Sequence, residues 1–140
     1  MTIINDIRAC LDTHLTNTVG IPLIARQNVP FKPVTGTPYL QGTLVPTSIR
    51  PAVRGLNPQK RYDGLYSLLV ATPEGLGSGA GYEYADLLLD RFGATTDISY
   101  TNPSTSETLI LSIDYSEVRT SFLDPPFYYT PVTVAWYIYH

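Results

Sequence analysis

Four glycines separated by single residues, Gly75, Gly77, Gly79 and Gly81, lie between an alternating apolar segment and an amphipathic one. A glycine-rich turn between a strand and a helix is where nucleotide-binding proteins hold phosphate groups. A Walker loop must end in Gly-Lys-Ser/Thr and a dinucleotide site needs the G-x-G-x-x-G spacing, and this segment has neither. Asp97 lies at about the distance of a ribose-binding acid, but the strand near it is short and polar. We interpret the glycines as a flexible turn that leads into a helix.

Other side chains that could do chemistry are few. The chain contains one cysteine, Cys10, so an internal disulfide or a thiol-based zinc site is excluded. Neither His14 nor His140 is followed three or four residues later by a metal-ligating residue. We expect Cys10 to be a small buried residue and His14 to lie on a helix surface. Three acidic residues at helical spacing are expected to form a solvated face: Glu83, Asp86 and Asp90. These residues predict no catalytic residue and no metal site.

Basic residues are concentrated in one part of the chain. Four of the nine lie within twelve positions, on or beside residues 47–60, a polar segment with no clear period: Arg50, Arg54, Lys60 and Arg61. Long loops in compact domains are usually functional or mobile. We interpret these residues as a candidate assembly loop that meets an acidic surface, either of another protein or of DNA. The alternative is a loop whose charges only keep it solvated.

The composition suits a protein whose surface is partly covered by other protein. Only 15% of the 140 residues are charged, below the usual quarter, whereas 44% are apolar. The eleven tyrosines are favoured both in strands and at interfaces. The candidate interface tyrosines are Tyr128, Tyr129, Tyr137 and Tyr139. A net charge of −3 argues against a protein that grips nucleic acid electrostatically. The first residues do not resemble a signal peptide, and no apolar run approaches the ~18 residues of a membrane span.

Hydrophobic periodicity divides the chain, which we expect to form one domain over residues 1–140, into helices and strands. Helices are predicted at residues 2–18 and 79–92, the second with a Ser78 cap. Strands are predicted at residues 21–27, 39–46, 61–72, 95–100, 107–115 and 127–139. This order predicts an α+β fold with two helices packed on one face of a mostly antiparallel sheet.

The last predicted strand carries the strongest pattern. Val132, Val134, Trp136 and Ile138 alternate on one face, and the other face is also fairly apolar. We therefore expect this strand near the centre of the sheet, or covered by a neighbouring subunit, with Trp136 in the core. In residues 107–115 the same alternation directs Tyr115 inward.

Several short segments, in this order, resemble a known family. The matching pieces are Val29-Pro30-Phe31, Thr37-Pro38-Tyr39, Arg61–Tyr66, Pro73–Gly77, Ala85-Asp86-x-Leu88 with Phe92, and Trp136. Each consists of structural and turn residues, and together they span nearly the whole chain. The sequence resembles the tail terminator, or tail completion, proteins of siphophage-type bacteriophages.

The resemblance implies a structural virion protein without enzyme activity or cofactor. Its copies would form a homo-hexameric ring that caps the tail tube, ends polymerisation of the tube protein and contacts a neck or head-completion protein. DNA would pass through the lumen without specific binding, and the protein would be made in the host cytoplasm and lie at the head-proximal end of the tail, with no membrane partner. Two alternatives are another ring protein of the neck, and a carbohydrate- or receptor-binding module.

Overall fold

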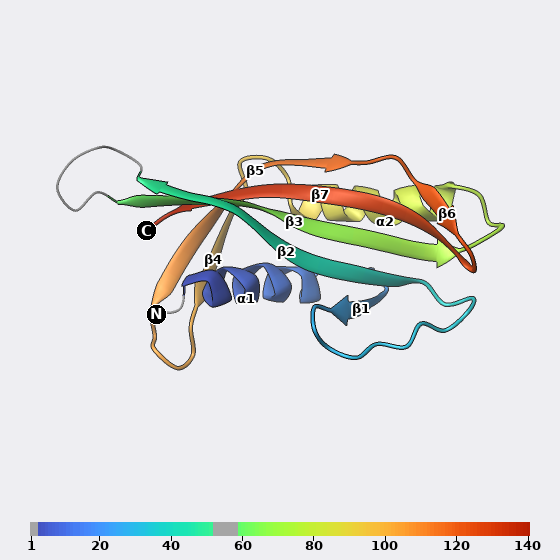
Figure 1. Cartoon of the computed structure of the whole chain (residues 1–140), viewed down its shortest axis with the longest axis horizontal. Helices are drawn as coiled ribbons and strands as arrows, with labels where there is room; N and C mark the ends of the chain where they lie inside the picture. The colour runs from blue at the N-terminus through green and yellow to red at the C-terminus, as the bar shows by residue number, and fades with distance from the viewer. Residues whose placement is uncertain (1–2, 52–58) are drawn as a thin grey trace.

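The computed structural model describes residues 3–51 and 59–140 (Figure 1). Its helices are α1 (Ile3–Thr16) and α2 (Gly79–Arg91). The strands are β1 (Leu23–Arg26), β2 (Tyr39–Pro51), β3 (Lys60–Pro73), β4 (Asp97–Thr101), β5 (Thr108–Val118), β6 (Phe122–Asp124) and β7 (Phe127–Tyr139). They form one sheet in the order β1-β2-β3-β7-β5-β4, with β6 paired to β7. Only the β1–β2 pair is parallel among the described strands, so the α+β prediction is confirmed.

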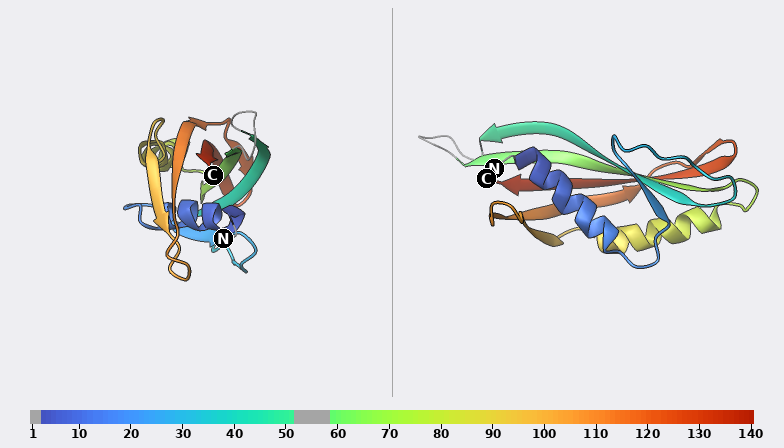
Figure 2. Two further views of the ribbon diagram at one scale, coloured as in Figure 1. Left: turned by 90° about the vertical axis from the view of Figure 1, so that its left-hand side faces the viewer. Right: turned by 90° about the horizontal axis from the view of Figure 1, so that it is seen from below.

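Both helices pack on the same face of the curled sheet, here called the inner face (Figure 2). At helical spacing, α1 buries Ile7, Leu11 and Leu15, and α2 buries Ala85 and Leu88. These side chains form one core cluster with alternate residues of β2, β3, β4, β5 and β7. Neither helix of the described chain has the length and hydropathy that a membrane crossing requires.

The central pair of the sheet is β3 with β7. Their antiparallel register runs from Arg61 opposite Tyr139 to Pro73 opposite Phe127. Trp136 is 1% exposed, and its indole lies over Gly64, the residue opposite it. A Cβ atom at Gly64 would lie 2.3 Å from Trp136 Cζ2, so no other residue type fits there without displacing the indole. The predictions of a central last strand and a core tryptophan are confirmed.

The predicted loop at residues 47–60 is wrong at both of its described ends. β2 continues to Pro51 and β3 begins at Lys60, so the two strands extend as a projecting hairpin (Figure 1). A register shift between Pro46 and Ser48 accommodates the proline within the ladder. Both faces of this part of β2 are exposed, and therefore the alternation that reveals a half-buried strand is missing. Residues 52–58 lie outside the described residues.

The structure differs from the predictions at three further places. A bulge between Ile113 and Tyr115 leaves Asp114 unpaired and turns Tyr115 to the outer face, contrary to the predicted inward orientation. Ser78 precedes α2 without forming a side-chain cap hydrogen bond. The three residues of β6 were not predicted, because a strand this short next to two prolines carries no periodic pattern.

The four glycines of the 75–81 segment differ in backbone conformation and in surroundings. Gly75 and Gly77 adopt left-handed backbone conformations, with φ of 85° and 76°, that glycine tolerates best. At Gly79 an added Cβ would meet nothing within 4 Å. At Gly81 it would lie 2.3 Å from Thr130 Oγ1, because α2 packs closely on β7. The glycines therefore form a turn and a close helix–sheet contact.

The contrast between Gly79 and Gly81 gives a first prediction. Gly79→Ala should be neutral or raise the free energy of unfolding by up to about 1 kcal/mol, because alanine restricts the unfolded chain. Gly81→Ala should lower it by about 1–3 kcal/mol, because the new methyl group overpacks the contact with Thr130. Urea unfolding of both variants measures the difference. Adding Thr130→Ala to Gly81→Ala should recover part of the loss, and equal stabilities for the two single variants would contradict the packing explanation.

Truncation of the central indole gives a second prediction. Trp136→Ala should lower the free energy of unfolding by about 3–5 kcal/mol, because it leaves a cavity between the helices and the sheet. Denaturant unfolding followed by circular dichroism measures the loss. A cost below about 1 kcal/mol would show that the core does not depend on this side chain.

Candidate assembly surface

The face of the sheet opposite the helices, here called the outer face, collects residues that are far apart in the sequence. The register places Arg50, Arg61 and Tyr139 in one row across β2, β3 and β7. Asp63 and Tyr137 lie side by side in the next row. Paired residues of neighbouring strands point to the same face, and for that reason the ladder itself assembles this group. We call these five residues the outer-face cluster.

Arg61 is the centre of the outer-face cluster. Its guanidinium lies 4.4 Å from the ring centroid of Tyr137 and 5.6 Å from that of Tyr139, the geometry of cation–π contacts. Nε donates to Asp63 Oδ1 at 2.8 Å, and Nη1 donates to the Tyr139 hydroxyl at 3.0 Å. These hydrogen bonds, the one to Asp63 foremost, raise the pKa of Arg61. The charge is therefore held in a fixed position over two aromatic rings.

Arg50, on the neighbouring strand β2, forms an ion pair with the same carboxylate, that of Asp63. Its Nη2 lies 3.3 Å from Asp63 Oδ2 as an ion pair without hydrogen-bond geometry. Two guanidinium groups therefore share one carboxylate, and the outer-face cluster keeps one net positive charge. Most of the Arg50 side chain is exposed, so its pairing with Asp63 is screened by water and contributes little to stability.

The other predicted residues lie elsewhere. Lys60 is exposed at the start of β3 with the opposite orientation to Arg61, and Arg54 lies outside the described residues. Tyr128 and Tyr129 lie at the far end of β7 from Tyr137 and Tyr139. Of the predicted residues that the structure describes, it thus brings together two of the three basic residues and two of the four tyrosines.

Tyr129 belongs to a separate aromatic group on the outer face. Its hydroxyl lies 3.0 Å from that of Tyr39, and its ring stacks on Phe122 with centroids 5.2 Å apart. Burial, followed by the hydrogen bond with Tyr129, raises the pKa of Tyr39. Tyr39 also packs edge-on against Phe127 and contacts Phe31 of the β1–β2 connection. This group seals one end of the sheet, with only its margin exposed.

An apolar row crosses the outer face beside the outer-face cluster. Val45, Leu65, Ala135 and Tyr115 pair in sequence across β2, β3, β7 and β5. No described helix covers this face, and both Val45 and Tyr115 are exposed. This row is not evident from the sequence, because the bulge that turns Tyr115 outward reverses the alternation of β5.

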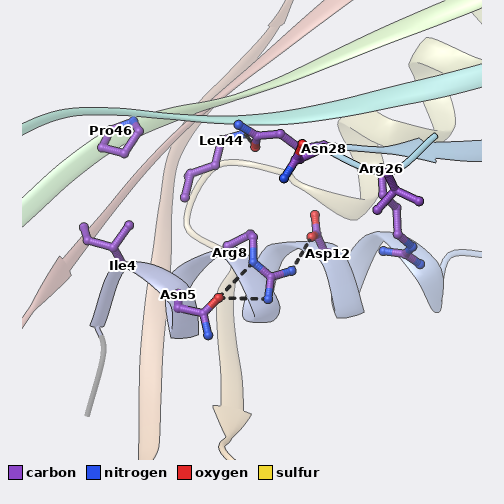
Figure 3. A pocket seen from close by; sticks show the side chains of 10 residues that line it. Ile4, Asn5, Arg8, Asp12, Arg26, Asn28, Leu44 and Pro46 are labelled. Carbon is purple, nitrogen blue, oxygen red and sulfur yellow. Dashed lines mark hydrogen bonds and ion pairs between the residues drawn. The ribbon is translucent and has the colours of Figure 1, made fainter. Parts of the chain in front are cut away.

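A groove of about 670 Å³ opens between α1 and the β1–β2 region (Figure 3). Its apolar lining comes from Ile4, Val29, Leu44 and Pro46, and its polar lining includes Asn5, Arg8, Asp12, Arg26, Gln27 and Asn28. Arg8 donates to Asn5 at 3.0 and 3.1 Å and to Asp12 at 3.0 Å, which fixes it along α1. Asp12 also accepts a 2.5 Å hydrogen bond from the Tyr66 hydroxyl, and this bond ties the helix to β3. No periodic pattern in the sequence indicates this groove, because its lining comes from three elements.

Cys10 and the acidic residues of α2, which could in principle take part in chemistry, are either buried in the core or exposed to solvent. Cys10 is buried, as predicted, and burial raises the pKa of its thiol to about 12. The predicted wet face of α2 is exposed at Glu83, Asp86 and Asp90. Within residues 3–51 and 59–140, no group of three or more His, Cys, Asp or Glu side chains could hold a metal ion.

His14 differs from its prediction as a surface residue. It is half-buried between the helices, where Nε2 donates to the Arg91 carbonyl oxygen at 2.9 Å. Its ring also meets Phe92 edge-on, with centroids 5.0 Å apart. Burial lowers the pKa of His14 below 6.5, so the folded protein favours the neutral imidazole. His14 therefore joins the end of α1 to the end of α2.

This environment predicts a pH dependence of stability. The unfolded chain binds a proton at His14 more readily than the folded chain, so the free energy of unfolding should fall as the pH drops below about 6.5. His14→Gln should weaken that dependence, whatever its effect at neutral pH, in urea titrations between about pH 7.5 and 5. His140→Gln, at the exposed C-terminal residue, is the control. An unchanged pH slope in His14→Gln would refute the assignment.

The comparisons with known proteins agree with this architecture. The profile of a family described as phage tail terminator protein matches residues 6–136. A solved structure with 19% sequence identity superimposes with a TM-score of 0.68, covering 97% of this chain and 94% of its own, and shows the same fold. None of the curated proteins matches the chain. Because the family profile covers nearly the whole sequence, the chain belongs to the phage tail terminator family, whose members are structural proteins of the bacteriophage tail.

Proposed function

We propose that copies of this chain close into a hexameric ring on the head-proximal end of the tail tube. The ring ends polymerisation of the tube protein and presents its other face to a head-completion or neck protein. The chain is made in the host cytoplasm and acts without catalysis or cofactor. Membership of the tail terminator family supports a structural role in the phage tail. The six-copy stoichiometry and the binding partners are what this proposal adds.

The uncovered outer face of the sheet is the observation that carries this proposal. The apolar row and the outer-face cluster lie beside each other on four strands, without a described helix over them. Tyrosine and arginine are enriched at protein interfaces, and a fixed guanidinium over aromatic rings loses little entropy on binding. A surface of this kind is better suited to burial against a protein partner than to exposure to solvent.

The charge of the chain suits a lumen through which DNA passes. A net charge of −3 repels the phosphate backbone and disfavours specific binding. Arg61 is held by Asp63 and the tyrosines, and Arg50 lies beside Asp63, so in this proposal both arginines are directed to a protein surface.

Native mass spectrometry and negative-stain electron microscopy of the purified chain test ring closure. We expect annular particles with the mass of six copies, either alone or when the tube protein of the same phage is added. Polymerising tubes should stop at shorter lengths as the chain is added. A chain that stays monomeric at high concentration with tubes present, and leaves their length unchanged, would overturn the proposal.

Reversal of one charge on the outer face gives a sharper prediction. Arg50→Glu should change the free energy of unfolding by no more than about 0.5 kcal/mol, because the side chain is exposed. It should reduce ring formation, because it replaces the exposed cation beside Asp63 with a repelling acid. Native mass spectrometry measures the ring fraction, and Lys32→Glu in the exposed β1–β2 connection is the matched control. If Arg50→Glu assembles normally, the Arg50 side chain takes no part in ring formation and is only solvated.

A further inference from the structure

Two turns at one end of the molecule form an acidic, apolar projection. The β3–α2 turn and the β6–β7 turn lie side by side at the end of the long axis away from the two termini (Figures 1 and 2). The Glu74 amide donates to the Pro126 carbonyl oxygen at 3.2 Å and holds the turns together. Leu76 is 66% exposed and Leu123 is 58% exposed. We call Glu74, Leu76, Leu123 and Asp124 the terminal knob.

The terminal knob carries only negative charge. Glu74 and Asp124 are both exposed, and no lysine or arginine occurs at residues 62–90 or 120–140. Leu76 lies in the β3–α2 turn and Leu123 in β6, next to the β6–β7 turn, so two exposed apolar side chains lie at the same end of the molecule. A partner surface for the terminal knob therefore needs an apolar recess bordered by positive charge.

The groove between α1 and the β1–β2 region has these properties. Ile4, Val29, Leu44 and Pro46 provide an apolar lining. Arg8 is balanced by Asp12 at 3.0 Å, whereas Arg26 donates to the Thr16 hydroxyl at 2.6 Å and forms no ion pair among the described residues. The exposed Arg26 therefore gives the groove one uncompensated positive charge (Figure 3).

The groove also lies beside an unpaired part of the sheet. β1 pairs with β2 only as far as Gly42, so within the described residues β2 has no strand on that side from Thr43 onward. The Leu44 amide is instead capped by Gln27 Oε1 at 3.2 Å. Among the described residues, no strand therefore closes the groove on this side.

We propose that the terminal knob of one copy inserts into the groove of the next copy. The inference rests on the proposed ring and adds a second contact between neighbouring copies to the one expected on the outer face. Leu76 and Leu123 enter the apolar lining, and Asp124 or Glu74 pairs with Arg26. The groove follows α1, away from the end that carries the terminal knob, so this contact joins two molecules (Figure 1).

Other segments of a second copy fit the groove less well. The projecting β2–β3 hairpin carries Arg50, Lys60 and Arg61, which would face the positive charge of Arg26. The terminal knob and the groove are different surfaces, and such a heterologous contact repeats around a ring until it closes.

Charge reversal tests the contact. Arg26→Glu and Asp124→Arg should each reduce the fraction of chain in rings by about tenfold, as expected for like charges that meet at an interface. The double variant should recover most of that fraction, because it restores the pair with its signs exchanged. Lys32→Glu and Glu107→Arg reverse exposed charges outside the terminal knob and the groove, and should assemble normally. Native mass spectrometry with the tube protein present measures all five variants.

Cysteine cross-linking provides a second readout. Val29→Cys and Leu123→Cys together should give a ladder of covalent oligomers on oxidation, whereas each single variant should not go beyond dimers. Cys10 can remain in place because it is buried and its pKa is raised to about 12.

The outcomes separate this inference from the proposed function. Rings that form normally in both single charge variants, without a cross-linked ladder in the cysteine pair, would overturn the knob-in-groove contact and leave the ring standing. A ladder of open chains without annular particles would support the contact and overturn ring closure. Monomers throughout, without any ladder, would overturn both.

Discussion

The contact between Trp136 and Gly64 is the constraint on which the rest of the structure depends. The indole occupies the space of a β-carbon at residue 64, since such an atom would lie 2.3 Å from Cζ2. If β7 slipped by one residue along β3, Asp63 or Leu65 would lie opposite the indole and their side chains would exclude it. The register of the central pair is therefore fixed by packing inside the core.

That register in turn determines the chemistry of the outer face. Arg61 meets Tyr139, and Asp63 meets Tyr137, only in this alignment of β3 with β7. A shift of one residue would exchange the inner and outer faces of the whole strand. The hydrogen bonds and cation–π contacts around Arg61 are therefore a consequence of where a tryptophan fits against a glycine on the opposite face.

The sequence was sufficient for the elements that bury one clear face. The stripes of α1 and α2 and the alternation of β3 and β7 predicted the fold class, and the bounds of β7 matched the structure. It was insufficient where no face is buried, as in β2 beyond Pro46, and where a bulge changes the alternation, as at Tyr115. The outer-face cluster depends on which strands are neighbours, a long-range property that local periodicity does not contain. The groove is not evident from the sequence for the same reason, because its lining comes from α1, β1, β2 and the connection between β1 and β2.

The irregular part of β2 has a consequence for how the protein behaves when it is crowded. Pro46 and Pro51 have no amide hydrogen, and the register shift after Pro46 interrupts the spacing of the remaining donors. A foreign strand cannot extend hydrogen bonds without interruption along this margin, so indefinite sheet-to-sheet growth into fibrils is obstructed. Contacts between copies at high concentration are therefore left to side-chain surfaces rather than to backbone pairing along this margin.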